Sequence, residues 1–333
     1  MQGLVYNPAN EILIAAGARP LIYAAYHTLV QPGDTIIFPM PSWNNNHYTH
    51  LSHAKKVEIL VAPENNFMPV ADNIKPFVKE SALISLCSPL NQTGTVFKRK
   101  QLEDICTLIL EENERRNEKP LYLMYDQIYW VLTFGDTGHC DPVTLIPEMR
   151  NYTVFIDDLL KSFTATGIRV GWSFGPSYVN GKMKSILSHL GAWAPKAEQA
   201  ATARYITNSK QENSYLDNFK REVRQRLERF YNRFMELRSE GYRVNSIAPQ
   251  AVIYLTVQFE LHGMKKEDGC VLATTKDITK YILEEAHVAI VPFHAFGDSD
   301  NSSWYRLSVG TCRLDDVNKV NAVQNNWHEI KLS

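Results

Sequence analysis

The sequence predicts an α/β protein in which a large, mostly parallel sheet precedes a smaller α+β unit. Short β-rich runs alternate with longer amphipathic stretches over the first half, a pattern typical of a sheet covered on both faces by helices. Helical patterns dominate after residue 175, and shorter strands return after Gly241. The length of 333 residues agrees with this division, because one domain accounts for roughly 150 residues.

The first half of the chain supplies the large sheet. Strands are expected at residues 11–16, 34–38, 56–61, 82–87, 120–125 and 153–157. Helices are expected at 19–30, 72–80 and 99–117, and the last carries Leu102, Ile105 and Leu108 on one face. In such sheets ligands bind beyond the carboxyl ends of the strands, so the residues after each strand are the candidates for a site.

The second half predicts helices near 176–190, 195–208 and 213–239, the last of them long and charged. Strands near 251–257, 287–291 and 304–309 and helices near 272–285 and 314–327 form the smaller unit. We therefore expect a large domain over residues 1–215 and a small C-terminal domain over 216–333.

Composition excludes several classes of function. Lysine plus arginine (35) balances aspartate plus glutamate (36), which leaves no electrostatic basis for binding nucleic acid or an anionic membrane. The five cysteines form no CxxC pair, and His47, His50 and His53 lack a further ligand, so no metal site is expected. No secretory signal is visible, and charged residues and proline interrupt the apolar run at 12–30. We expect a soluble, cytoplasmic protein.

Polar residues follow the predicted strands at the points where the strands end. Gly17-Ala18-Arg19-Pro20 is a turn whose free N–H groups could cradle a phosphate at a helix start. The later strand ends carry, in chain order, Asn91 within SPLNQTG, Asp126 and Tyr129 within DQIY, Lys161, and Arg169. An amide, a carboxylate, a phenol, a lysine and an arginine are therefore expected at one rim of the sheet.

These residues stand in motifs that resemble the class I and II aminotransferases, which are fold type I pyridoxal 5'-phosphate (PLP) enzymes related to aspartate aminotransferase. The matching pieces occur in the order of that family: PSWNNN at 41–46, SPLNQTG at 88–94, YDQIY at 125–129, KSFTATGIR at 161–169, FHAFG at 293–297 and WYRLS at 304–308. The resemblance spans most of the chain and implies the aspartate aminotransferase-like PLP-dependent transferase fold and a homodimer.

The resemblance implies how the ring of PLP would be held. Lys161 would form the Schiff base and move a proton, which requires a lysine of lowered pKa. Asp126 would face the pyridine nitrogen and keep it protonated, so that the ring withdraws electrons. Asn91 and Tyr129 would hydrogen-bond the 3′ oxygen, and Trp43 would stack on the ring. Lys161, Asp126 and Tyr129 are thus the implied catalytic residues.

The resemblance also implies a phosphate site and a substrate site. Ala18 and Arg19 at the turn, together with Arg169, would hold the cofactor phosphate. Arg306 would bind the substrate α-carboxylate through a bidentate fork, with Asn91 beside it. The implied reaction exchanges an amino group between an amino acid and a 2-oxo acid.

The chain departs from the family pattern in three respects. Asp158 and Leu160 stand where the family carries small or hydroxyl residues before the lysine, so a hydroxyl donor is lost and an anion comes near the phosphate. Gln92 replaces the usual proline of its loop. Only 16 residues precede the phosphate turn, where the family has a longer segment. Two alternatives therefore stay open: a PLP-dependent lyase of the same fold, and a catalytically weak PLP-binding homologue.

Overall fold

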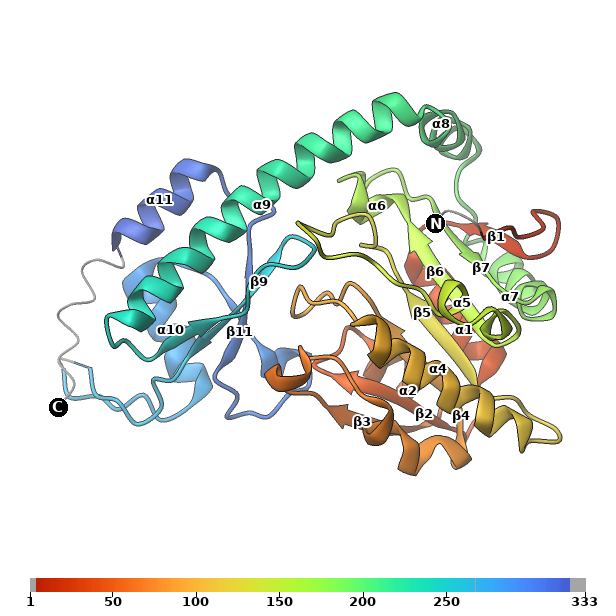
Figure 1. Ribbon diagram of the computed structural model, residues 1–333, viewed down its shortest axis with the longest axis horizontal. Helices are drawn as coiled ribbons and strands as arrows, with labels where there is room; N and C mark the ends of the chain where they lie inside the picture. The colour runs from red at the N-terminus through yellow and green to blue at the C-terminus, as the bar shows by residue number, and fades with distance from the viewer. Residues whose placement is uncertain (1–3, 267, 324–333) are drawn as a thin grey trace.

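The computed structural model describes residues 4–266 and 268–323, and its larger part is built on a seven-stranded sheet (Figure 1). The strands are β1 (Ile12–Ala15), β2 (Thr35–Met40), β3 (Lys55–Leu60), β4 (Ser81–Cys87), β5 (Tyr122–Asp126), β6 (Thr153–Asp158) and β7 (Gly171–Phe174), in the spatial order β1-β7-β6-β5-β4-β2-β3. Strands β2 to β6 pair in parallel, and β7 runs antiparallel to both of its neighbours. The expected mostly parallel sheet is confirmed.

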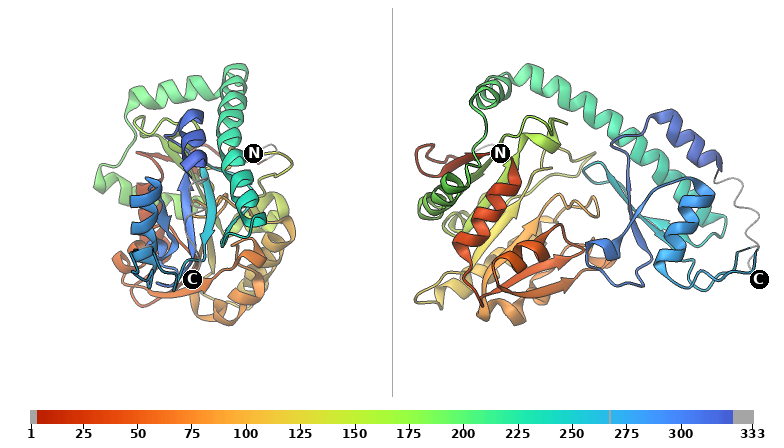
Figure 2. Two further views of the ribbon diagram at one scale, coloured as in Figure 1. Left: turned by 90° about the vertical axis from the view of Figure 1, so that its left-hand side faces the viewer. Right: turned by 180° about the vertical axis from the view of Figure 1, so that it is seen from behind.

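Helices cover both faces of this sheet and create two apolar cores. On one face α1 (Ala18–Leu29) and α7 (Ser177–Leu190) pack together, with Leu21 and Met183 fully buried. The ribbon of α4 (Arg99–Glu114) lies on the other face of the sheet (Figure 2). This helix buries the predicted stripe of Leu102 and Ile105. Because apolar side chains on both faces of the strands are buried, the candidate site residues stand at the strand ends and in the loops that follow them.

Short elements complete the large domain. They are α2 (Asn45–Leu51), α3 (Ala71–Ile74), α5 (Pro142–Leu145), α6 (Leu159–Ser162) and the 3₁₀ helices Pro63–Asn65, Lys75–Glu80 and Pro147–Asn151. The helix expected over 72–80 is one α-helical turn followed by a 3₁₀ helix that begins beside Pro76, a residue that lacks the N–H an α-helix needs. Strand β7 was not predicted from the sequence.

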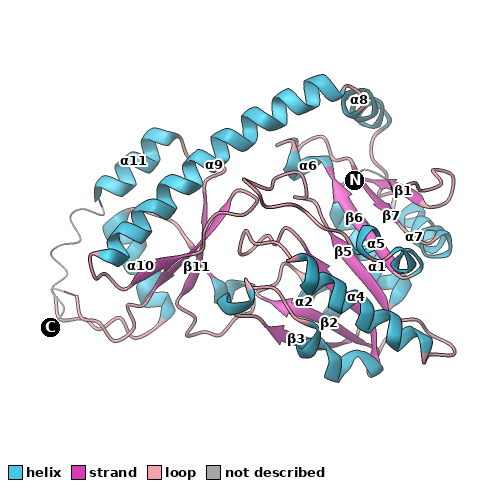
Figure 3. Ribbon diagram, in the orientation of Figure 1, coloured by secondary structure: helices cyan, strands magenta, loops and turns pink. Residues whose placement is uncertain are grey.

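The smaller part is an antiparallel four-stranded sheet covered by helices (Figure 3). Its strands are β8 (Val244–Ser246), β9 (Tyr254–Phe259), β10 (Val291–Pro292) and β11 (Trp304–Ser308), in the order β10-β11-β9-β8. Helices α10 (Thr275–Ala286) and α11 (Leu314–Val323) belong to it, while residues 324–327 of the expected last helix lie outside the described residues. An α/β domain with a smaller α+β domain is the fold class expected from the sequence.

Two helices link the parts, α8 (Lys196–Ile206) and the long α9 (Ser209–Ser239), which Figure 1 shows running from the large sheet to the small one. Residue 215 lies within α9, and the division at that residue stays a prediction. Hydrogen bonds also join the two parts directly: Thr256 Oγ1 donates to the carbonyl of Thr93 at 2.7 Å, and Gln250 Nε2 donates to Asn66 Oδ1 at 2.6 Å. The loop after β4 therefore faces the small sheet. No helix in the described part of the chain combines the length and apolar character needed to span a membrane.

Candidate active site

The carboxyl ends of β2, β4 and β5 border one cavity. Trp43, Asn91 and Asp126, which the sequence predicts to act together, all line this cavity. Each follows or ends a different strand of the sheet, and the parallel arrangement brings their loops to the same edge. The predicted convergence of polar residues on one rim is therefore present for these three.

Asp126 is the last residue of β5, and its carboxylate accepts a hydrogen bond from the N–H of Ile128 at 3.2 Å. The pKa of Asp126 is raised to about 7. Burial is the largest cause, the negative charge of Asp158 adds to it, and the hydrogen bond from the Ile128 N–H opposes it. A carboxyl group in this condition gains free energy by pairing with a cation, because a nearby positive charge favours its ionised form.

Asn91 connects the two domains at the centre of the site. Its Nδ2 donates to the Tyr129 hydroxyl at 3.1 Å, and its Oδ1 accepts from Arg306 Nη1 at 2.7 Å. Tyr129 is buried, with 1 % of its surface exposed, and its ring packs edge-on against Tyr254. The loop after β4, the loop after β5 and strand β11 are thereby held together by one amide side chain.

Arg306 enters the site from β11 among aromatic rings. Its guanidinium lies 4.3 Å from the centre of the Tyr254 ring and 4.6 Å from that of Phe296. Burial lowers the pKa of Arg306, and its Nε has no hydrogen-bond partner among the described residues. A buried guanidinium with an unused donor is suited to a carboxylate ligand, which would replace the hydration it has lost.

Trp43 lies at the mouth of the cavity in the loop after β2. Its side chain is 42 % exposed, and its ring centre lies 6.1 Å from that of Phe296 and 5.9 Å from the Arg306 guanidinium. A large flat side chain held beside the guanidinium, yet exposed, is available to cover a planar ligand.

Lys161 is carried by the short helix α6, directly after β6. Asp158 caps this helix by accepting hydrogen bonds from the N–H groups of Leu160 at 2.9 Å and Lys161 at 3.4 Å. The Ser162 hydroxyl donates to the carbonyl of Ile128 at 2.6 Å, which fixes α6 against the loop that carries Asp126 and Tyr129. The lysine backbone is therefore placed beside the rim of the cavity.

The predicted phosphate turn lies next to Arg169. Gly17 has a φ of 95°, and a Cβ on this residue would lie 2.7 Å from Arg169 Nη2. The guanidinium donates to the carbonyl oxygens of Ala16 at 2.8 Å and Thr166 at 3.1 Å, and it forms no ion pair within the described residues. The side chain of Arg19 is exposed, so the group that this residue offers a phosphate at the turn is its backbone N–H.

Several residues of the site were not singled out from the sequence. Asn45 and Ser85 line the same cavity and hydrogen-bond to each other at 3.0 Å, and Tyr26 donates to Asn45 at 2.8 Å. Gly171 lies so close to the turn that a Cβ on it would stand 2.6 Å from the carbonyl carbon of Gly17. The asparagine run at 44–46 was the available signal for Asn45, whereas Gly171 follows Arg169 in the sequence without any pattern of its own.

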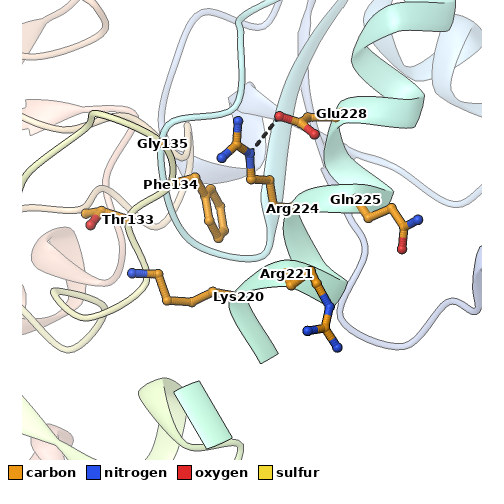
Figure 4. A pocket seen from close by; sticks show the side chains of 8 residues that line it. All are labelled: Thr133, Phe134, Gly135, Lys220, Arg221, Arg224, Gln225 and Glu228. Atoms are coloured by element: carbon orange, nitrogen blue, oxygen red, sulfur yellow. Dashed lines mark hydrogen bonds and ion pairs between the residues drawn. The ribbon is translucent and has the colours of Figure 1, made fainter. Parts of the chain in front are cut away.

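A second cavity of about 500 Å³ lies apart from this site, between the loop 133–135 and α9 (Figure 4). Lys220, Arg221 and Arg224 line it, and Arg224 pairs with Glu228 at 2.7 Å. None of the predicted site residues lines it. No group of three His, Cys, Asp or Glu side chains able to hold a metal ion occurs among the residues described.

Other solved structures have the same fold as this chain, with a large sheet domain followed by a smaller one. The crystal structure of the aspartate aminotransferase from Rhizobium meliloti superposes with a TM-score of 0.85 at 22 % identity, covering 96 % of this chain and 76 % of that one. The family model for aminotransferase class I and II matches residues 1–322. The chain belongs to the class I and II aminotransferase family, and it is an aminotransferase with the aspartate aminotransferase-like fold.

Curated relatives agree with this assignment. The aspartate aminotransferase of Geobacillus stearothermophilus is 29 % identical over 314 residues, which are 93 % of this chain and 74 % of the relative. That of Bacillus sp. strain YM-2 is 27 % identical over 296 residues, or 88 % and 71 % of the two chains. The aminotransferase resemblance read from the sequence motifs is confirmed.

The residues present fit the ring of PLP, which this family implies as cofactor. Asp126, whose carboxylate a cationic partner would stabilise, lines one cavity with Trp43 and with Asn91, the partner of Tyr129. At the turn that would hold the phosphate of PLP, the residues fit the group less well. Arg169 is available to an anion, but the N–H of Ala18 already stabilises the carboxylate of Asp158, because it lowers the pKa of that group.

Proposed function

We propose that this aminotransferase uses PLP bound through Lys161 to move an amino group between an amino acid and a 2-oxo acid. The observation that carries the proposal is the joining of two loops and strand β11 at one cavity, where Asn91 hydrogen-bonds both Tyr129 and Arg306 beside Asp126. An aromatic cation can be held by a carboxyl group and a phenol, which Asp126 and Tyr129 supply. A carboxylate can be held beside it by a desolvated guanidinium, which Arg306 supplies.

The cofactor, when bound, supplies an electron sink for the bond broken at the substrate Cα. Asp126 would hold the ring nitrogen by giving it the carboxyl proton and pairing with the cation that results. Arg306 binds and orients the substrate carboxylate, while Trp43 excludes water from above. Lys161 acts as a general base that takes the proton from the substrate Cα, and in the next step it acts as a general acid that gives this proton back.

Borohydride reduction followed by peptide mapping tests this proposal. The protein incubated with PLP should carry the reduced adduct on Lys161, and Lys161→Ala should lose both the adduct and turnover. Lys220→Ala is the matched control, because Lys220 lines the other cavity and should leave labelling unchanged. An adduct on another lysine of the folded protein would contradict the proposal.

The reaction type is tested by its products. A PLP-dependent lyase of this fold would use the same lysine and electron sink, but it would release a substrate substituent and ammonia. An aminotransferase instead converts the amino acid to a 2-oxo acid without free ammonia, in an amount limited by the bound cofactor when no acceptor is added. L-Aspartate is the first donor to assay, since the relatives are named for it. Release of ammonia together with a substrate substituent, in amounts that exceed the bound cofactor when no acceptor is added, would favour the lyase.

We also propose a homodimer that works in the cytoplasm. Support for the dimer comes from the family resemblance and from large apolar side chains exposed on the large domain, including Tyr178 at 66 %, Leu190 at 54 % and Trp193 at 38 %. Light scattering should give twice the mass of the 38.1 kDa chain. A monomer at micromolar concentration would contradict this part of the proposal.

A further inference from the structure

The turn that would receive a phosphate already holds a carboxylate. Asp158, which ends β6, is 4 % exposed and accepts hydrogen bonds from the N–H groups of Leu160 and Lys161 in α6. Across the β6–β7 ladder Asp158 pairs with Gly171, which packs so closely on the turn that a Cβ there would lie 2.9 Å from the N of Ala18, the first residue of α1. The N–H of Ala18 lowers the pKa of the Asp158 carboxyl group. Donors that lie far apart in the sequence thus converge on one side chain.

These donors are the ones that an anionic ligand would need. The N-terminus of α1, a helix of 12 residues, carries a partial positive charge that favours an anion beside it. Arg169 lies at the same turn, and within the described part of the chain its guanidinium hydrogen-bonds only to carbonyl oxygens. Beside them, Leu160 Cδ2 would lie 3.3 Å from a Cβ on Gly17, so the wall of the turn is apolar where a hydroxyl would help an anion.

We propose that Asp158 acts as an internal anion in this turn and takes the place that the cofactor phosphate would occupy. The inference rests on the proposed PLP site and concerns only its phosphate end. With the Ala18, Leu160 and Lys161 amides engaged, the phosphate finds Arg169 alone and meets the charge of Asp158. The phosphate adds a charge of about −2, and like charges in a buried turn repel strongly. The site therefore gains little affinity from the phosphate.

Charge rather than helix capping is the decisive feature, and one substitution separates the two. Asp158→Asn keeps a side chain that caps a helix as well as aspartate does, but it carries no charge. Asp158→Gly removes the side chain and frees the three amides. Asp158→Gly/Leu160→Ser adds a hydroxyl and removes the apolar wall.

The experiment compares PLP with pyridoxal, which has the same ring and aldehyde without the phosphate. Absorbance titration of the full chain gives the ratio of the two dissociation constants. We expect the ratio to be within about threefold of one for the wild type and to favour PLP by about 10- to 100-fold in Asp158→Gly, the gain expected when a charged group makes new hydrogen bonds. The double variant should gain at least as much, and Asp158→Asn should gain an intermediate amount.

Inorganic phosphate supplies a second readout that does not involve activity. Millimolar phosphate should raise the melting temperature of Asp158→Gly but not that of the wild type. Asp157→Asn is the matched control, since Asp157 is an equally buried neighbour that accepts from Trp130 Nε1 at 3.0 Å and from none of the three amides. Its PLP-to-pyridoxal ratio should equal that of the wild type.

The outcomes distinguish this inference from the proposed function. If pyridoxal and PLP both label Lys161 but the wild type already prefers PLP by tens-fold, and Asp158→Gly changes nothing, Asp158 does not compete with phosphate and the inference fails alone. If neither compound labels Lys161, the proposed function and the inference fall together. Should Asp158→Gly not fold, the comparison of Asp158→Asn with the wild type decides in the same way.

Discussion

Arg306 shows how a single residue can link packing and substrate recognition. Aromatic rings remove water from its guanidinium, and one of its donors is used by Asn91 while Nε has no described partner. A cation that has lost its hydration without gaining a carboxylate is held at a cost in free energy. A substrate carboxylate relieves that cost, so binding at this position is favoured before any chemistry occurs.

Arg306→Ala should therefore weaken the use of every amino-acid substrate. We expect kcat/KM to fall, chiefly through a higher KM, because a charged hydrogen bond to the α-carboxylate is lost. The fall should correspond to a loss of about 1.5–3 kcal/mol of transition-state stabilisation. Arg306→Lys should recover little, since an ammonium cannot form the planar fork. Steady-state kinetics with several donors checks this, and Arg224→Ala in the other cavity serves as control. Unchanged kinetics in Arg306→Ala would contradict the assignment.

Gln92 is the opposite case, a buried amide that lacks partners. Its side chain is fully buried, and both of its polar atoms are without a hydrogen-bond partner in the described structure. Gln92→Leu should raise the free energy of unfolding by about 1 kcal/mol, because an unpaired polar group is costly to bury. Asn113→Leu is the contrast: that amide bonds the backbone of Leu121 twice, at 2.7 and 3.0 Å, so its removal should destabilise. Urea unfolding measures both, and a destabilised Gln92→Leu would show that the amide has a partner.

At the scale of elements, the site depends on the close approach of β7 to the turn before α1. A Cβ on Gly171 would stand 2.6 Å from the carbonyl carbon of Gly17 and 2.9 Å from the N of Ala18. Contacts this short with backbone cannot be relieved by rotating a side chain. Strand β7 and the turn must therefore separate if residue 171 carries any side chain.

Gly171→Ala should destabilise the protein by about 2 kcal/mol or more, as expected for overpacking against backbone. Gly181→Ala provides the matched control, because a Cβ there meets nothing within 4 Å and lies in α7. That control should stabilise the helix by about 0.5–1 kcal/mol. Thermal unfolding of both variants checks the prediction, and equal melting temperatures would count against the tight packing.

The elements that the sequence predicts well are those with a strong local pattern. The strands β2 to β6 and the helices α1, α4 and α7 were expected at nearly their observed bounds, because each carries a continuous apolar run or an apolar stripe. Strand β7 was missed, since its four residues GWSF have no local period and it is held by pairing with β1 and β6. The same limit applies to the site. The polar strand ends could be predicted, but the Asn91–Arg306 bond joins residues 215 positions apart.

At the scale of the whole molecule, buried carboxyl groups gather where the strands end. Burial raises the pKa of Asp126 to about 7, and it also raises the pKa values of Asp157 and Asp158, each further raised or lowered by its neighbours. A group whose pKa is raised by folding holds its proton up to a higher pH in the folded state than in the unfolded chain. Their net effect on stability depends on pH, and His139 acts in the opposite sense, because burial lowers its pKa to about 4.

The contribution of Asp126 can be isolated by comparing Asp126→Asn with the wild type, both free of PLP. Between about pH 4 and pH 7 the folded wild type holds a proton on Asp126 that the unfolded chain has released, so its stability falls as pH rises. The variant lacks this group, and His139 is common to both proteins. Asp126→Asn should therefore become more stable relative to the wild type as pH rises, by a total on the order of 2 kcal/mol after allowance for partial exposure. Urea unfolding at pH 4.5 and pH 7.5, values chosen to lie near the two ends of this window, measures the difference. A difference that stays constant with pH would mean that Asp126 is ionised throughout this range and that burial does not raise its pKa in the folded protein.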